Sequence, residues 1–239
     1  MSSSLDGRTV VVIGRASGLA HAVTLAARAC GARVVVAGRD KEALGQAYED
    51  DEHITAEYVD VTDDDSIAAL ARRLGRVDHV VSTASARARG RLGELDRKAL
   101  RRSFDTKVIG PVMVAKHFAP HIAEGGSFVL FSGVAAFKPA IGYLGVAITN
   151  GAVDFLTRSL ALELGPIRVN AISPGVIDTG IWDSMGEEGK NAYFTGLRTR
   201  NPARRIGTPE DIADAVVFAM TNPFLTGVTL RVDGGEPLT

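Results

Sequence analysis

The sequence has a single cysteine, no excess of charge of one sign and no long apolar run. With Cys30 alone, the 239 residues exclude an intramolecular disulfide bond and a zinc site built of cysteines, and Cys30 is expected to be a packed residue. The 27 basic and 28 acidic residues give a net charge of −1, which provides no overall field for nucleic acid or a membrane. No apolar run has the length that spans a bilayer, and Met1-Ser2-Ser3-Ser4 lacks the apolar core of a signal peptide. We therefore expect a soluble cytoplasmic protein.

Apolar strands alternate with helical stretches along the whole chain, of which 46% is hydrophobic. The expected strands are Thr9–Ile13, Arg33–Ala37, Ile54–Asp60, Val77–Ser82, Ser127–Phe131, Ile167–Ile172 and Val228–Val232. Long helical regions are expected over Asp96–His117 and Gly142–Leu164, and Gly125-Gly126 is expected to turn the chain into the fifth strand. This alternation predicts one α/β domain over residues 1–239, a Rossmann-type doubly wound parallel sheet of about seven strands. Ligands then bind at the carboxyl ends of the strands.

The first thirty residues or so form the most informative part of the chain. A β-branched strand, Thr9–Ile13, is followed by Gly14-Arg15-Ala16-Ser17-Gly18-Leu19-Ala20, a helix to Cys30 and a second strand. Glycines at such a turn allow the backbone to approach a ligand closely, and the start of the helix offers free N–H groups to a pyrophosphate. The strand before the turn and the helix after it favour dinucleotide binding over an ordinary turn.

Further motifs extend this pattern over essentially the full length. They are Gly14-x-x-x-Gly18-x-Ala20, Asp60-Val61, Ser82-Thr83-Ala84-Ser85, Pro174-Gly175-x-x-x-Thr179, Pro209-Glu210-Asp211-Ile212-Ala213 and Val232-Asp233-Gly234-Gly235. Together they resemble the classical short-chain dehydrogenase/reductase family. The resemblance implies that cofactor contacts come from Gly14, Arg15, Ser17, Gly18, Leu19, Arg39, Asp60, Val61, Ala84, Pro174, Gly175, Ile177 and Thr179.

The cofactor predicted from these residues is NADP(H). Members of the family that prefer NAD usually close the second strand with an acid, whereas this chain has Gly38 there, followed by Arg39. Arg15 lies in the glycine turn and faces the same region. Two guanidinium groups suit a ribose 2′-phosphate, which a plain ribose lacks. The alternative is that both arginines are merely solvated.

The family's catalytic Asn-Ser-Tyr-Lys tetrad is substituted in this alignment. Its four positions fall on Lys107, Gly133, Val146 and Asn150. Lys and Asn have exchanged places, so a cation would come from the other helix. Tyr143 precedes Asn150 by seven residues, two helical turns, which is the Tyr-x6-Lys spacing of the divergent enoyl reductases. Tyr143 is thus a candidate proton donor, or else a packing residue at the start of the helix.

Ser132 is a further candidate hydroxyl, expected to point to the opposite side of the strand from residue 133. The segment at about 181–201 occupies the place of the family's substrate lid. Arg87, Arg89 and Arg91 follow the fourth strand and face either an anionic substrate or solvent.

Three functions remain open: an NADPH-dependent reductase of a carbonyl or enone with Tyr143, Lys107, Asn150 and Ser132 in its site, a cofactor-binding protein without redox activity, and a non-redox enzyme. The resemblance also implies a homodimer or homotetramer that binds a small-molecule substrate. The balanced charge predicts no nucleic-acid or membrane partner, and no metal is expected.

Overall fold

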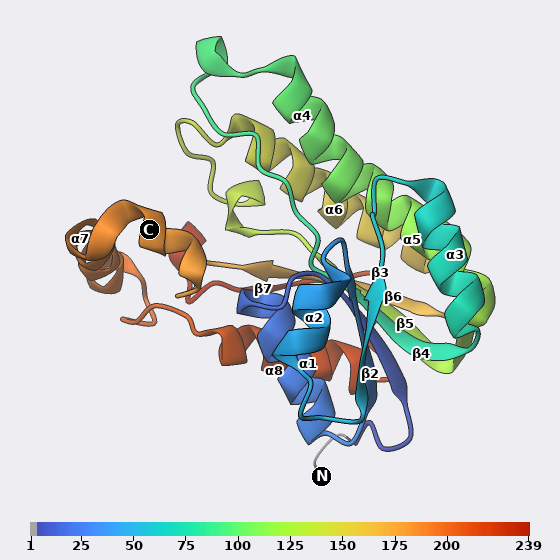
Figure 1. Ribbon diagram of the computed structural model, residues 1–239. Coiled ribbons are helices and arrows are strands. Elements are labelled where there is room, and N and C mark those ends of the chain that lie inside the picture. The colour runs from blue at the N-terminus through green and yellow to red at the C-terminus, as the bar shows by residue number, and fades with distance from the viewer. Residues whose placement is uncertain (1–3) are drawn as a thin grey trace.

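A seven-stranded parallel sheet forms the centre of the computed structural model, which describes residues 4–239 (Figure 1). The expectation that rested on Met1–Ser3 lies outside the described residues. The strand order is β3-β2-β1-β4-β5-β6-β7. The strands are β1 Thr9–Ile13, β2 Arg33–Gly38, β3 Ile54–Tyr58, β4 Val77–Ser82, β5 Ile122–Phe131, β6 Arg168–Pro174 and β7 Thr229–Val232. This is the predicted Rossmann-like α/β fold.

Helices cover both faces of the sheet, which is why its strands read as continuous apolar runs. They are α1 Gly18–Ala29, α2 Lys41–Ala47, α3 Asp64–Leu74, α4 Arg97–Phe104, α5 Gly110–Phe118, α6 Leu144–Glu163, α7 Gly186–Arg200 and α8 Pro209–Thr221. Alternate residues of β1 point to opposite faces of the sheet. Val10 and Val12 pack in the core beneath α1, α2 and α8. Val11 and Ile13 pack in the core beneath α3, α5 and α6. Cys30, directly after α1, packs against the first of these cores.

The helix predicted over Asp96–His117 contains a π-helical turn. Asp105–Ile109 forms this turn between α4 and α5, and Lys107 lies in its middle. Such turns are rare and often lie at functional sites. Nothing in the local sequence distinguishes it from ordinary helix.

The expectation for Gly125-Gly126 was wrong, because both glycines lie within β5 rather than in a turn before it. The pairing of β4 with β5 shifts between Val77 and His79, and Gly125 has a φ of +77°. A side chain at Gly126 would come within 2.8 Å of the carbonyl oxygen of Ala123. The pair therefore allows a bulge inside a longer strand.

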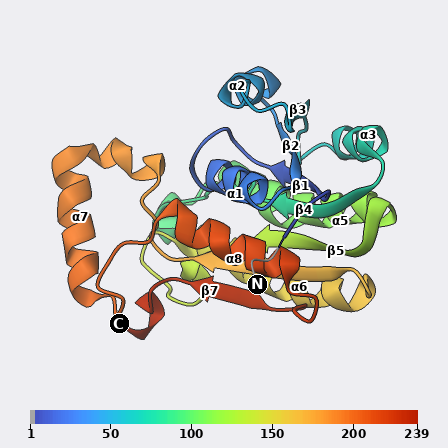
Figure 2. The ribbon, with the colours of Figure 1, turned by 90° about the horizontal axis from the view of Figure 1, so that it is seen from below.

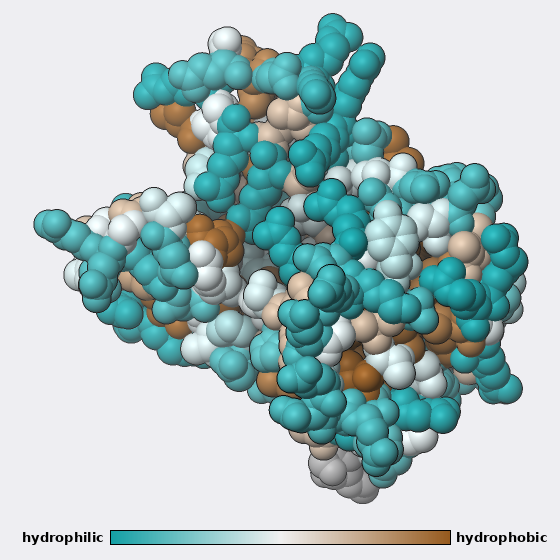
Figure 3. Space-filling model, viewed as in Figure 1, coloured by the Kyte–Doolittle hydropathy of each residue, from teal (hydrophilic) through white to brown (hydrophobic). Residues whose placement is uncertain are grey.

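The segment after β6 projects from the layered body, as α7 does at the left of Figure 2. It consists of the 3-10 turn Gly180–Met185 and α7, whose Trp182, Tyr193 and Phe194 pack together with ring centroids 5.2 to 6.3 Å apart. The space-filling view is hollowed between this projection and the one that carries α4 (Figure 3). The hollow lies on the side of the molecule at which α7 projects.

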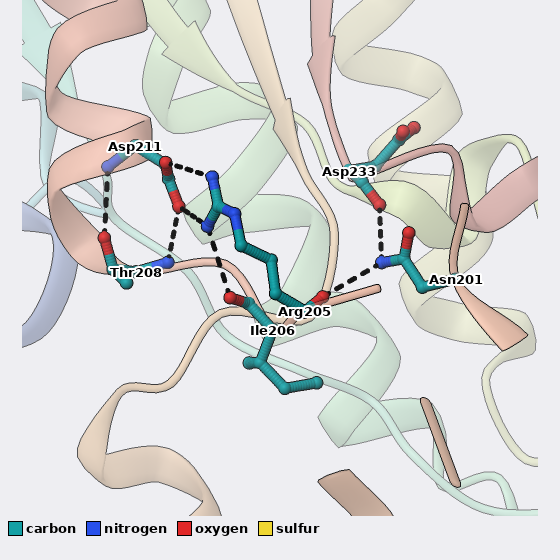
Figure 4. A network of polar contacts seen from close by, with 6 residues as sticks. All are labelled: Asn201, Arg205, Ile206, Thr208, Asp211 and Asp233. Carbon is teal, nitrogen blue, oxygen red and sulfur yellow. Dashed lines mark hydrogen bonds and ion pairs between the residues drawn. The ribbon is translucent and has the colours of Figure 1, made fainter. Parts of the chain in front are cut away.

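A polar network ties the C-terminal end of α7 to the start of α8 (Figure 4). Asn201 Nδ2 donates to the carbonyl oxygens of Arg205 and Asp233, each at 3.4 Å. The Arg205 guanidinium holds the Asp211 carboxylate at 2.5 and 2.6 Å, and Asp211 also accepts from the backbone N–H of Thr208 at 2.8 Å. The network fixes the base of the projecting segment. Within residues 4–239 no helix combines the length and apolar character needed to cross a bilayer.

Candidate functional site

Glycines let the turn after β1 pack closely against the end of β2. A side chain at Gly38 would lie 2.5 Å from the carbonyl oxygen of Gly14, so glycine is needed where the two strand ends meet. Gly18 has a φ of +60°, a conformation that glycine adopts without strain. Ser17 precedes α1 with extended backbone and makes no side-chain capping bond, and the first turn of α1 contains no acid. The first N–H groups of α1, with its positive dipole end, are left for an anionic group.

Arg15 and Arg39 flank this turn, and both are exposed. Neither forms an ion pair with an acid of residues 4–239. Asp60 lies in the same region: partial burial would raise its pKa, but hydrogen bonds from Thr62 and the charges of Arg39 and Arg102 lower it. Two exposed cations without an ion-pair partner in residues 4–239 thus stand beside the glycine turn, with the Asp60 carboxylate in the same region. Val61, beside Asp60, is buried and packs in the core.

Residues of the loops after β4 and β6 contact the end of β1 and the glycine turn. Thr83 donates to the carbonyl oxygen of Ile13 from its N–H at 2.9 Å and its hydroxyl at 3.0 Å. Gly175 donates to the carbonyl oxygen of Val232 at 3.0 Å, and Thr179 lies 3.8 Å from the place of a side chain at Gly18. The structure therefore brings together the predicted cofactor residues from these loops, with Ala84, Pro174 and Ile177 as their neighbours in the chain and Leu19 in the first turn of α1.

Three of the predicted catalytic residues form one connected unit. Lys107 is 7% exposed and its Nζ donates to the carbonyl oxygen of Ser132 at 3.0 Å. The Ser132 hydroxyl in turn donates to the backbone carbonyl of Asn150 at 2.9 Å. Desolvation by burial, together with the charge of Arg87, lowers the pKa of Lys107 to about 7. Lys107 and Asn150 are thus linked through Ser132, without a direct hydrogen bond between them.

The orientation predicted for Ser132 was wrong. A side chain at Gly133 would come 2.7 Å from Asn150 Nδ2, so positions 132 and 133 both face Asn150. β5 ends at Phe131, so the alternation of side chains along a strand no longer applies beyond it. Asn150 is 3% exposed, and its Oδ1 has no hydrogen-bond partner among the described residues.

Tyr143 lies apart from this unit, at the start of α6. It is half-buried, and the Arg89 guanidinium stands over its ring, 5.1 Å from the centroid. No hydrogen bond joins Tyr143 to Lys107 or Asn150 in the part of the chain that the structure describes. Arg87, also close to Tyr143, has its pKa lowered by desolvation and by the charges of Arg89 and Arg15. Arg87 and Arg89 are both exposed, and Arg89 also contacts Tyr143, so whether they face an anionic substrate or solvent stays a prediction.

The site contains no group of side chains suited to a metal. Across residues 4–239, no three His, Cys, Asp or Glu side chains gather where they could hold an ion. The polar groups that do converge are backbone N–H groups, arginines, one buried lysine and hydroxyls. Such groups stabilise anions and move protons.

Known proteins are similar to this chain in both sequence and fold. The family model described as enoyl-(acyl carrier protein) reductase matches residues 14–236. A short-chain dehydrogenase/reductase from an Acremonium species is 32% identical over 256 residues, covering 98% of this chain and 97% of the relative. The L-xylulose reductase of Mus musculus is 30% identical, covering 98% of both.

A solved structure is similar over the same length. A small-chain dehydrogenase in complex with NADPH superposes with a TM-score of 0.87 at 31% identity, covering 98% of this chain and all of that one. The family-model match, residues 14–236, includes the glycine turn and the Val232-Asp233-Gly234-Gly235 motif. The chain therefore belongs to the short-chain dehydrogenase/reductase family of oxidoreductases.

Proposed function

We propose that this protein is an NADPH-dependent oxidoreductase that reduces a carbonyl or enone group of a small molecule through a non-standard active site. The observation that carries the proposal is the pair of unpaired arginines, Arg15 and Arg39, beside an uncapped helix start. The NADPH held by a structural relative supports the same choice of cofactor. In this proposal the family's four catalytic positions are Lys107, Gly133, Val146 and Asn150.

Bound NADPH supplies the hydride. The N–H groups at the start of α1 hold its pyrophosphate, Arg15 and Arg39 bind the 2′-phosphate, and Asp60 with Val61 meets the adenine. Thr179, after β6, lies against Gly18 of the glycine turn, and together with Ile177 it would hold the nicotinamide carboxamide. The remaining predicted cofactor contacts in these loops are Ala84, Pro174 and Gly175.

A proton must reach the substrate oxygen, and Tyr143 is the proposed donor because no hydroxyl stands at Val146. A general acid is worth about 10²–10⁴ in rate. Lys107 supplies positive charge from the buried side, where the Ser132 carbonyl fixes its ammonium. Asn150 offers a neutral amide in place of the family's lysine. The proposed lid, at about 181–201, would cover the reacting groups with Trp182, Tyr193 and Phe194.

Assembly into a homodimer or homotetramer belongs to the same proposal. Leu144, Ile148, Phe155 and Leu162 are exposed large apolar residues of α6. Spacings of four and seven residues place them along one face of the helix. Burial of such a face against a second copy would remove it from water.

The test is to mix the purified protein with NADPH and a panel of ketones, aldehydes and enones. NADPH oxidation, followed at its absorbance band, is expected with at least one class. NADPH binding without oxidation across the panel would contradict the reductase proposal. It would instead favour a cofactor-binding protein without redox activity, or a non-redox enzyme that uses the same pocket.

A further inference from the structure

Two arginines of one loop, Arg87 and Arg89, lie between the proposed proton donor and the buried Lys107, and the reductase proposal uses neither. The loop between β4 and α4 contributes Arg87 and Arg89, both exposed. Arg89 stacks over the Tyr143 ring, and the charge of Arg87 reaches the buried ammonium of Lys107. The charges of Arg89 and Arg15 act on Arg87 in turn. The cluster therefore consists of Arg87 and the three cations whose charges interact with it, Arg15, Arg89 and Lys107, and Arg89 is the member that contacts Tyr143.

No acid compensates this cluster. Some arginines elsewhere in the fold are paired, as Arg8 is with Asp78 at 2.7 Å and Arg28 with Asp51 at 2.9 Å. Within residues 4–239, none of the four cations of the cluster lies within 4.0 Å of a carboxylate. Like charges held together without counter-charge repel one another and favour the binding of an anion.

The cofactor accounts for only part of this charge. Arg15 lies in the glycine turn, where the phosphates of a dinucleotide are expected. Arg89 instead lies over the Tyr143 ring and Arg87 acts on Lys107, at the end of the site where proton transfer is proposed. The Arg89 guanidinium lies over the ring and pairs with no carboxylate of residues 4–239, so its N–H groups stay available to an oxyanion.

We propose that Arg87 and Arg89 recognise an anionic group, carboxylate or phosphate, on the substrate, so that the substrate class is a small carbonyl compound that carries such a group. The assignment to a substrate rests on the proposed reductase function. The stack of Arg89 on Tyr143 then couples recognition of the anion to the position of the proton donor. A neutral analogue of the same shape lacks this contact.

The experiment measures binding by calorimetry to the full chain loaded with NADP⁺. The probes share one methyl ketone: para-acetylbenzoate, para-acetylphenyl phosphate and the neutral methyl ester of para-acetylbenzoate. At least one anionic probe is expected to bind about tenfold or more tightly than the ester, with an affinity that falls as salt is added. The stronger of the two anions identifies the group.

The variants Arg87→Gln and Arg89→Gln should each weaken binding of the anionic probe about tenfold and leave the ester unchanged. Arg76→Gln is the matched control, because this exposed arginine precedes β4 at the opposite end of the sheet. Both site variants replace exposed loop residues, and thermal melting checks that they fold. Arg87→Lys should recover part of the affinity.

Three results would overturn the inference: the ester binding as tightly as both anions, no binding of either anion, or equal losses in Arg89→Gln and Arg76→Gln. A fourth is a loss of NADPH affinity in Arg87→Gln and Arg89→Gln that matches their loss of probe affinity, since the arginines would then serve the cofactor phosphates. Reduction is read separately from NADPH oxidation. Anion binding without oxidation would contradict the reductase proposal alone.

Discussion

The ammonium of Lys107 and the carbonyl oxygen of Ser132 lie 3.0 Å apart, and this carbonyl is the only hydrogen-bond acceptor that the described part of the chain offers to Lys107. A buried ammonium with one acceptor is poorly solvated compared with one in water. Desolvation, with the nearby charge of Arg87, lowers the pKa of Lys107 to about 7. A lysine in this position changes its charge in the physiological range of pH.

This position predicts a specific pH dependence of stability. In the unfolded chain Lys107 titrates near 10.5, so between about pH 7 and 10.5 the unfolded state binds more protons than the folded state. The contribution of Lys107 to the free energy of unfolding therefore increases as pH rises through that window. The increase is lost again as pH falls to about 7. Lys107→Met should remove this slope. Urea unfolding at several pH values between about 6 and 9 measures it, with the exposed Lys98→Met as control. Parallel curves for Lys107→Met and the unsubstituted protein would contradict the buried charge.

The side chain of Asn150 is predicted to leave room only for glycine at position 133. A methyl group at Gly133 would lie 2.7 Å from Asn150 Nδ2 in a buried place, so Gly133→Ala should cost about 1–3 kcal/mol of unfolding free energy. In an Asn150→Ala background the same substitution should cost little. Gly151→Ala, in the same helix with open space around it, is the control and should be neutral or stabilising. Equal costs of Gly133→Ala in both backgrounds would show that the two residues do not compete for space.

Tyr143→Phe tests the proposed proton donor. If the hydroxyl delivers the proton, turnover should fall by about 10²–10⁴, while the dissociation constant of NADPH stays the same. Steady-state kinetics with the best substrate of the panel, and fluorescence titration of NADPH, give the two readouts. Tyr58→Phe, an exposed tyrosine of β3, controls for loss of any hydroxyl. Undiminished turnover in Tyr143→Phe would assign the ring to packing under Arg89.

Arg39→Ala tests the choice of cofactor. A charge-assisted hydrogen bond contributes about 1.5–3 kcal/mol, so NADPH should bind roughly ten- to a hundredfold more tightly than NADH, and the variant should lose most of that ratio. Titration of both cofactors measures it. Arg33→Ala removes an exposed arginine from the other end of β2 and should leave the ratio unchanged. Equal affinities in the unsubstituted protein would rule out the 2′-phosphate contact.

The base of the projecting segment should weaken in acid. The hydrogen bonds from the Arg205 guanidinium, followed by those from Thr208, lower the pKa of Asp211 to about 2. Stability from this carboxylate is therefore complete above its ordinary pKa of 3.8 and is lost as pH falls towards about 2. Asp211→Asn should cost about 1 kcal/mol near neutral pH, because the pair is partly exposed. Urea unfolding at neutral pH and in acid measures both effects; a cost that persists unchanged at about pH 2 would contradict them.

Most of the fold could be predicted because strands that are buried on both faces of a sheet appear in the sequence as runs of β-branched residues. Thr9–Ile13 and Val77–Ser82 were predicted with the bounds that the structure has. Glycine is ambiguous by nature, since it allows both turns and bulges, and Gly125-Gly126 was therefore assigned to a turn. The predicted third strand ran to Asp60 but β3 ends at Tyr58, because a polar strand at the edge of a sheet carries a weaker signal.

The site was less predictable because it depends on long-range contacts. Motif spacing placed the glycine turn and the loops after β4 and β6, whose meeting follows from the parallel sheet. The burial of Lys107 has no local signal, since lysines are almost always exposed. The contact of Arg89 with Tyr143 joins two loops that lie 54 positions apart in the chain, residues 89 and 143, and no periodicity reports such a contact.

The π-helical turn also affects how α4 and α5 are rotated relative to each other about the helix axis. An α-helix advances by about 100° per residue, so an uninterrupted helix would fix the angle between the inward faces of α4 and α5. The wider turn at Asp105–Ile109 resets that angle. α4 can keep the Ser103 hydroxyl on the carbonyl oxygen of Ala86 while α5 keeps Phe118 in the core. Lys107 lies within the π-helical turn, whose orientation is set by neither α4 nor α5, and its side chain points into the protein. The buried charge of this protein therefore depends on the local change of helical pitch as well as on the lysine itself.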